Sequence, residues 1–95
     1  MQQKPEVTID LVKLTAKIGN KSLGLSLTEM RIMIFFLSHK GKIVTRSEIL
    51  AVMYPDDPNK NGAFSNIVDV YINHIRLKIG KERIATVKRS GYVFD

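Results

Sequence analysis

The sequence predicts an α+β fold in which an N-terminal antiparallel β-meander precedes three helices and a C-terminal β-hairpin. Two observations carry this prediction. Apolar residues recur with a period of two near both ends of the chain, which is typical of strands, and with a period near 3.6 between them, which is typical of helices. Two helix-start signals also follow the meander in close succession, at Ser26 and Thr45.

The meander is the first expected element. Residues 12–18, VKLTAKI, alternate strictly between apolar and polar side chains, which indicates a half-buried strand. The residues EVTID precede this strand, and GNK provides a turn after it. Leu23, Leu25 and Leu27 then continue the alternation. Together these segments predict a three-stranded meander.

A capping box predicts the start of each of the next two elements. Ser26 is followed three residues later by Glu29, and Thr45 is followed three residues later by Glu48. In such a box the hydroxyl accepts a hydrogen bond from the glutamate amide, while the carboxylate accepts one from the amide of the capping residue. The helices predicted from these starts are 27–39 and 45–53.

The last part of the chain predicts a third helix and a hairpin. Residues 54–65 are rich in turn formers, so we expect a loop there, followed by a helix over 65–79 that Gly80 ends. Residues 83–94 are expected to form a hairpin, because RIATV and YVF bracket the short connection KRSG. The whole chain, 1–95, is therefore predicted to be a single winged helix-turn-helix domain, a fold whose third helix commonly enters the DNA major groove.

Composition limits the functions that so short a chain can perform. Ninety-five residues provide one small core and one binding surface, not a deep two-lobed active site. The absence of cysteine excludes disulfides and thiolate metal ligands. No apolar run has the length of a membrane span and no signal-peptide core begins the chain, so we expect a cytoplasmic protein without membrane contact. The net charge of +6 favours nucleic acid as a partner, although a solvated basic surface explains it equally well.

The sequence contains no pattern that predicts an enzyme. It has neither a glycine-rich phosphate loop nor a local Ser/His/Asp pattern. Its two histidines, His39 and His74, lack the spacing of metal ligands. We therefore expect no catalytic residues, no metal, no cofactor and no small-molecule substrate.

The third helix has two faces of different chemistry. One face is expected to lie in the core and consists of Val68, Ile72, Ile75 and Ile79. The opposite face mixes amide and apolar side chains where lysine and glutamate would suit water better. Its residues are Asn66, Val70, Asn73 and Leu77, flanked by Asp69 and His74. Because an outward Asp69 would repel phosphate, we expect it to orient Arg76 or a neighbouring asparagine.

Three segments match a known family in order and spacing: LSLTEMRIMIFFLSHKGKIVTRSEIL, IVDVYINHIRLKI and IATVKRSGYVF. They resemble the DNA-binding effector domain of OmpR/PhoB-type bacterial response regulators, and the resemblance covers residues 7–94. It implies a transcription factor of a two-component system whose third helix reads the major groove and whose wing reaches the adjacent minor groove. Such proteins usually carry an N-terminal receiver domain, which this sequence lacks, either because the domain was removed or because it is naturally absent.

The chain departs from the pattern of the family at positions that face DNA. Asn73 and His74 replace two consecutive basic residues of the third helix, and Leu77 replaces another basic residue. In the wing, Lys88 aligns with the arginine of the family, and Arg89 replaces a turn glycine. These departures reduce the positive charge of the third helix, whereas the wing keeps its positive charge.

Base contacts are expected from three residues of the third helix. The Asn73 carboxamide suits the N6 and N7 edge of adenine, and Val70 suits a thymine methyl group. The alternatives are an ordinary solvated asparagine and an incidentally exposed valine. His74 is expected to face a base or a phosphate. Leu77 is expected to pack on the wing or on a neighbouring protomer.

Contacts to the DNA backbone are expected around this helix. Asn66 lies near the helix start, where a polar side chain and free amides favour a phosphate. Arg76 and Lys78 match basic positions of the family, with an intramolecular ion pair as the alternative for Arg76. Tyr54, which replaces a usual tryptophan, and Thr86 offer hydroxyls, with packing and strand propensity as their alternatives.

The wing carries the clearest positive charge. Lys88 and Arg89 lie in a short turn held by two strands, so their charges are expected to project from a rigid tip. Either side chain is expected to insert into a minor groove. Arginine suits A·T-rich sequence best, because its guanidinium is weakly hydrated.

Two functions remain open from the sequence. The first is sequence-specific binding of double-stranded DNA for bacterial transcription regulation, by two protomers on tandem half-sites. The second is a protein-interaction module, with weak or lost DNA binding, that contacts RNA polymerase through the loop 54–65. The resemblance implies this role for the loop, and the candidate contacts are Asp56, Asp57, Asn59 and Lys60.

Overall fold

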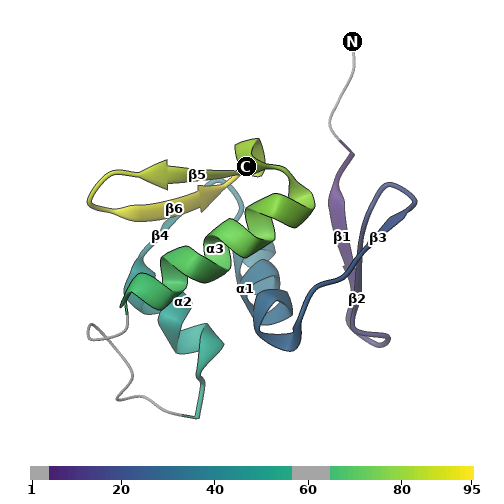
Figure 1. Ribbon diagram of the computed structural model, residues 1–95, viewed down its shortest axis with the longest axis horizontal. Helices are drawn as coiled ribbons and strands as arrows, with labels where there is room; N and C mark the ends of the chain where they lie inside the picture. Colours follow the sequence, from purple (N-terminus) through teal and green to yellow (C-terminus); the bar gives the residue numbers. More distant parts are fainter. Residues whose placement is uncertain (1–4, 57–64) are drawn as a thin grey trace.

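The computed structural model describes residues 5–56 and 65–95, in which three helices pack with two small antiparallel sheets (Figure 1). The strand order is β1-β2-β3 in the first sheet and β4-β6-β5 in the second. The elements are β1 Val7–Asp10, β2 Thr15–Ile18, β3 Lys21–Leu23, α1 Leu27–Ser38, β4 Ile43–Val44, α2 Arg46–Met53, α3 Ser65–Ile79, η2 Lys81–Arg83, β5 Ile84–Val87 and β6 Gly91–Phe94. The predicted order of meander, three helices and hairpin is confirmed.

The meander is shorter than its alternating pattern predicts. β2 begins at Thr15, so the strand expected over 12–18 is wrong in its first three residues. Asp10 gives the physical reason, because its Oδ1 accepts hydrogen bonds from the backbone N–H groups of Val12 at 2.9 Å and Lys13 at 3.0 Å. Such a side-chain bond closes a turn in place of an extended strand. The third strand also ends early, because the chain leaves the sheet after β3 and enters α1.

Both capping boxes are present. The backbone N–H of Ser26 donates to Glu29 Oε1 at 2.8 Å, and the N–H of Glu29 donates to Ser26 Oγ at 3.2 Å. The N–H of Thr45 donates to Glu48 Oε1 at 2.8 Å, and the N–H of Glu48 donates to Thr45 Oγ1 at 3.1 Å. Thr45 is therefore the cap of α2 and not its first residue.

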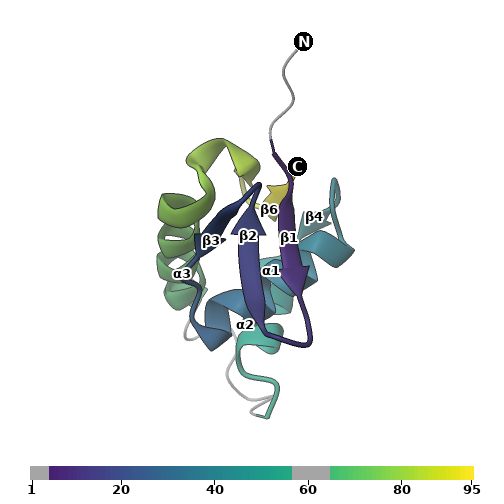
Figure 2. The same ribbon diagram turned by 90° about the vertical axis from the view of Figure 1, so that its right-hand side faces the viewer.

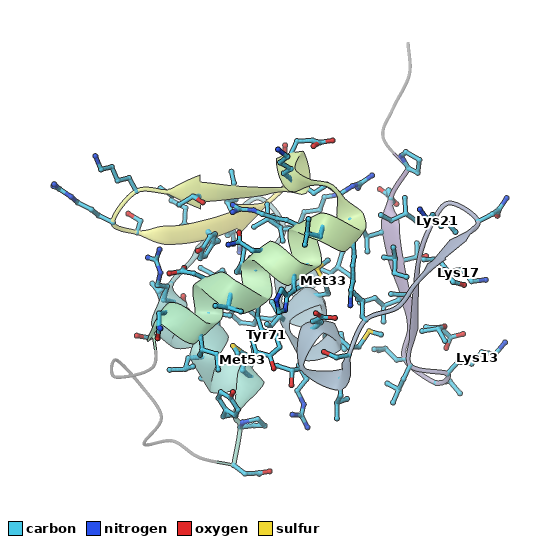
Figure 3. All side chains as sticks on the ribbon, viewed as in Figure 1. Lys13, Lys17, Lys21, Met33, Met53 and Tyr71 are labelled. Carbon is cyan, nitrogen blue, oxygen red and sulfur yellow. The ribbon has the colours of Figure 1, made fainter. Side chains whose placement is uncertain are left out.

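The hydrophobic core lies between the helices and the inner sides of the sheets. The residues of α3 predicted to face inward are buried, which confirms that face: Val68, Ile72, Ile75 and Ile79. Phe36 of α1 and Phe94 of β6 pack with their ring centroids 6.1 Å apart. Figure 3 shows the side chains of Met33 and Met53, from α1 and α2, in this interior. The core thus holds α3 with its other face outward.

The second sheet contains a strand that sequence patterns do not reveal. β4 has two residues between α1 and α2, and it pairs with β6 opposite Tyr92 and Val93. Gly91 permits this pairing, because a Cβ added at Gly91 would lie only 2.0 Å from the carbonyl oxygen of Val44. The wing is therefore attached to the connection between α1 and α2 and is not a free two-stranded hairpin.

A 3-10 turn, η2, joins α3 to the wing. The hairpin expected over 83–94 therefore begins one residue later, at Ile84. Arg83 is buried, and its Nη2 donates to the carbonyl oxygen of Pro5. This bond connects the start of the meander to the start of the wing. Figure 2 shows the meander as a layer in front of α1.

Candidate nucleic-acid interface

The outward residues of α3 form one exposed face. Val70 has 46% of its surface exposed, and Leu77 has 86%. Asn66, Asn73 and His74 are exposed as well. Two large apolar side chains are thus exposed on this face between amide side chains. The structure therefore brings the base-contacting candidates of the sequence onto a single face.

Asp69 does not pair with Arg76 as expected. Its Oδ1 accepts a hydrogen bond from Arg46 Nε of α2 at 2.9 Å and another from the hydroxyl of Tyr92 on β6. Asp69 and Arg76 are seven residues apart, which separates them by about 10 Å along a helix. The structural role expected for Asp69 is thus present, but it joins α3 to α2 and the wing.

Tyr92 and Arg46 are residues of this region that sequence reasoning missed. The Tyr92 ring is buried, and the Arg46 guanidinium lies 5.3 Å from its centroid. Burial and the hydrogen bond to Asp69 raise the pKa of Tyr92, so the hydroxyl remains a donor at neutral pH. The hydrogen bond to Asp69 raises the pKa of Arg46. No local pattern signals this cluster, because its members come from three elements.

Arg76 fastens α3 to β5. Its Nε and Nη2 donate to the carbonyl oxygen of Ile84 at 3.0 Å and 2.7 Å, and Nη2 also donates to Thr86 Oγ1 at 2.9 Å. Its Nη1 donates to Asn73 Oδ1 at 3.4 Å. A guanidinium has five N–H groups, so these bonds leave at most one for a phosphate. The ion pair considered for Arg76 is not among its contacts with the described residues.

Lys78 has a partner within the protein. Its Nζ donates to Glu29 Oε1 at 2.7 Å and to the carbonyl oxygen of Gly24 at 2.5 Å. Burial raises the pKa of Glu29, but the hydrogen bonds from Lys78 and from the Ser26 amide outweigh it, so the pKa lies below 4.5. A phosphate would therefore compete with Glu29 for this ammonium group.

The tip of the wing holds two exposed cations. Lys88 and Arg89 lie in the turn between β5 and β6, which Ser90 closes by donating its N–H to the carbonyl oxygen of Val87 at 2.9 Å. Arg89 has a φ of 64°, a left-handed conformation that favours glycine. In Figure 1 the hairpin runs alongside α3. The wing and the exposed helix face thus belong to one side of the fold.

The end of α2 and the following loop are described only in part. Tyr54 is the C-cap of α2, and its half-buried ring packs against the core. Asp56 is exposed. The remaining loop candidates lie outside the described residues: Asp57, Asn59 and Lys60.

A second group of cations lies far from the wing. Figure 3 shows Lys13, Lys17 and Lys21 extending from the meander on the side away from the helices. All three are exposed. Part of the positive charge therefore lies away from α3 and the wing.

Comparison with known proteins identifies the family. Residues 20–94 match the family described as "Transcriptional regulatory protein, C terminal". The chain belongs to this family. Its members are OmpR/PhoB-type DNA-binding domains of transcription regulators and not enzymes, which confirms both the resemblance drawn from the sequence and the prediction that this is no enzyme.

Relatives of this chain include transcriptional regulatory proteins of bacteria. The transcriptional regulatory protein CseB of Streptomyces coelicolor is 30% identical over 87 residues, which are 92% of this chain and 36% of that protein. The transcriptional regulatory protein PhoP of Escherichia coli K12 is 28% identical over 95 residues, which are 96% of this chain and 41% of that protein. The chain thus spans less than half the length of these relatives.

A solved structure of the family has the same fold. The DNA-binding domain of Klebsiella pneumoniae RstA, crystallised in complex with the RstA box, superposes with a TM-score of 0.81 at 26% sequence identity. The match covers 98% of this chain and 94% of that domain.

Within residues 5–56 and 65–95, no helix has the length and apolar character needed to cross a membrane.

Proposed function

We propose that this domain binds double-stranded DNA sequence-specifically to regulate transcription in the bacterial cytoplasm, with α3 in the major groove and the β5–β6 wing in the adjacent minor groove. The exposed mixed face of α3 beside a basic wing tip carries the proposal. A major groove offers thymine methyl groups and base edges to such a face. The RstA domain, which has this fold, was crystallised with DNA, and this similarity supports the proposal.

Base reading is assigned to the middle of α3. Val70 contacts a thymine methyl group, and Asn73 contacts a base edge in the groove. His74 lies on the same exposed face, with its ring centroid 6.0 Å from that of Tyr71. This contact positions the imidazole, which then meets a base or a phosphate.

Backbone contacts surround these positions. Asn66, near the helix start, and the hydroxyls of Tyr54 and Thr86 bind phosphate oxygens. Arg76 contributes its remaining N–H. Lys78 is the least favoured of this set, because Glu29 already holds its ammonium group at 2.7 Å.

The wing supplies most of the exposed positive charge of the proposed interface. Lys88 and Arg89 enter the minor groove, where a narrow A·T-rich sequence has the strongest negative potential. α3 then chooses the sequence, while the wing supplies much of the electrostatic attraction. Two protomers on tandem half-sites would double both contributions.

A salt titration of affinity tests this assignment. The affinity for a duplex carrying a selected site is measured by fluorescence anisotropy from low to high salt. The slope of log K against log salt is expected to be about 0.9 per neutralised phosphate, so Lys88→Ala lowers it by about one phosphate. Lys17→Ala is the matched control, because it removes the same charge from the far side of the meander and leaves the slope unchanged.

The readout part is tested with Asn73→Ala and Arg89→Ala. Asn73→Ala is expected to relax the preference at one base pair, whereas Arg89→Ala weakens binding most on A·T-rich flanks. Equal affinity of the wild type and both variants for every duplex would contradict groove recognition.

A contact to RNA polymerase is a second proposed role, for the loop 54–65. A groove of about 450 Å³ beside the start of this loop is lined mainly by apolar side chains of α1 and α2, including Phe35, Val52 and Pro55. Asp56, which follows Pro55 in the sequence, is exposed. Asp56→Ala is expected to lower transcription in vitro without changing DNA affinity. Unchanged transcription together with unchanged affinity would contradict this role.

A further inference from the structure

We infer that Arg76 orients the carboxamide of Asn73 so that α3 reads the acceptor-only edge of guanine and not the mixed edge of adenine. The inference rests on the proposed function, because it names the base that the exposed face of α3 selects. It assigns Arg76 a positioning role, through Asn73, in addition to the one N–H that Arg76 has left for a phosphate.

The guanidinium of Arg76 is the fixed member of the pair. Three of its hydrogen bonds go to β5, two to the carbonyl oxygen of Ile84 and one to Thr86 Oγ1. Its carbon atom also lies 5.5 Å from the centroid of the buried Tyr92 ring. Asn73 is exposed and stands three residues earlier, on the same side of the helix. The Asn73 carboxamide therefore takes the orientation that the fixed Arg76 guanidinium requires.

This contact determines which end of the amide points outward. Arginine has only donors, so the oxygen of the Asn73 carboxamide faces it, and Nη1 donates to Oδ1 at 3.4 Å. The NH₂ group lies on the other side of the same planar group. Asn73 also lines a hollow of about 350 Å³ together with Arg76, Leu77 and Lys81. The NH₂ donor of Asn73 thus belongs to a surface with two cationic side chains, Arg76 of α3 and Lys81 of η2.

The outward donor selects among bases by its match to their edges. Adenine presents the N7 acceptor and the N6 amino donor, so a full pairing uses both ends of an asparagine amide. Guanine presents two acceptors, N7 and O6. An NH₂ group beside a guanidinium can donate to both guanine acceptors, whereas it repels the amino group of adenine. We therefore expect Asn73 to pair with guanine and not with the adenine that an asparagine alone would suit.

Selection from a library of randomised duplexes tests the inference. The wild type is expected to prefer guanine over adenine by about tenfold at one base pair, and Asn73→Ala loses this preference. Arg76→Lys keeps the charge but lacks the fork that holds β5 and Asn73 together, so the preference falls toward equality at that base pair alone. Arg31→Lys, on α1, is the matched control and leaves every preference unchanged.

Asn73→Asp provides a second test that leaves Arg76 in place. The carboxylate offers only acceptors, so the preference at the same base pair is expected to move to a base with an amino group, cytosine or adenine. Circular dichroism melts verify that each variant is folded. If Arg76→Lys does not fold, the move produced by Asn73→Asp, together with guanine selection by the wild type, still supports the inference.

Two results would overturn it. One is selection of adenine by the wild type at the base pair that depends on Asn73. The other is an Arg76→Lys variant that binds every duplex more weakly by the same factor with its preferences unchanged, which is the behaviour of a phosphate contact. Both leave sequence-specific binding intact. A wild type without any base preference would instead overturn the proposed function, and this inference with it.

Discussion

The hydroxyl of Tyr92, on β6, donates a hydrogen bond to Asp69 Oδ1, on α3. Arg46 of α2 donates to the same oxygen at 2.9 Å. The tyrosine has only 3% of its surface exposed, so this bond connects the buried side of the wing to the helix. Tyr92 and Arg46, which are not among the residues expected to touch DNA, thus help Arg76 to set the position of the wing relative to α3.

Tyr92→Phe is expected to lower the free energy of unfolding by about 1 kcal/mol, because the ring remains packed while its hydrogen bond is lost. Urea denaturation measures the change. Tyr71→Phe, on α3, is the control, since the Tyr71 hydroxyl makes no hydrogen bond with the described residues. The control is expected to change stability by less than about 0.5 kcal/mol. Equal losses in the two variants would show that the bond to Asp69 does not stabilise the fold.

Gly91→Ala is expected to destabilise the protein by more than about 3 kcal/mol or to prevent folding. Its Cβ would lie 2.0 Å from the carbonyl oxygen of Val44, and the φ of 141° is also unfavourable for alanine. Gly24→Ala is the matched control, because an added Cβ there has no atom within 4 Å. Thermal melts compare the two. A Gly91→Ala protein as stable as Gly24→Ala would contradict the tight β4–β6 pairing.

Arg89→Gly is expected to separate stability from DNA affinity. A non-glycine residue at a φ of 64° costs about 1–2 kcal/mol, and glycine removes this strain. The greater chain entropy of glycine in the unfolded state offsets about 0.5–1 kcal/mol of that gain. The variant should therefore be as stable as the wild type or slightly more so, while its affinity for A·T-rich DNA falls. Lys88→Gly removes the same charge without relief of strain. A loss of stability in Arg89→Gly would show that its guanidinium holds the turn.

Local signals in the sequence predicted most of the fold. The capping boxes at Ser26 and Thr45 depend on residues three apart, so they predicted both helix starts to within one residue. The inward face of α3 followed from helical periodicity. β4 could not be predicted, because two residues have no period and their pairing depends on the absence of a side chain at Gly91.

The candidate site was predictable only in part. Helical periodicity was enough to place Val70 and Asn73 on the exposed face of α3. The partner of Asp69 and the bonds of Arg76 to β5 depend on how α2 and the wing pack against α3. Contacts between elements distant in the sequence leave no local pattern, so the sequence identified the residues that face outward but not those that hold them.

Stability is expected to fall in acid through Glu29. Its pKa in the folded protein lies below the ordinary 4.5, because the hydrogen bonds from Lys78 and the Ser26 amide outweigh the opposing effect of burial. A group with a lowered folded pKa contributes stability that is complete above its unfolded pKa and is lost as the pH falls through the folded value. The contribution of Glu29 is therefore full at neutral pH, begins to fall near pH 4.5 and is lost as the pH falls through the lower folded pKa.

Glu29→Gln tests this expectation. Glutamine can still accept the hydrogen bond of the capping box, but it cannot form the ion pair with Lys78. At pH 7 the variant is expected to be less stable than the wild type by about 1–2 kcal/mol, and this difference should shrink as urea unfolding is repeated toward pH 3. Glu82→Gln, at an exposed glutamate without an ion pair among the described residues, should show a small difference at every pH. A gap between wild type and Glu29→Gln that stays constant from pH 7 to pH 3 would mean that the charge of Glu29 does not stabilise the contact between α1 and α3.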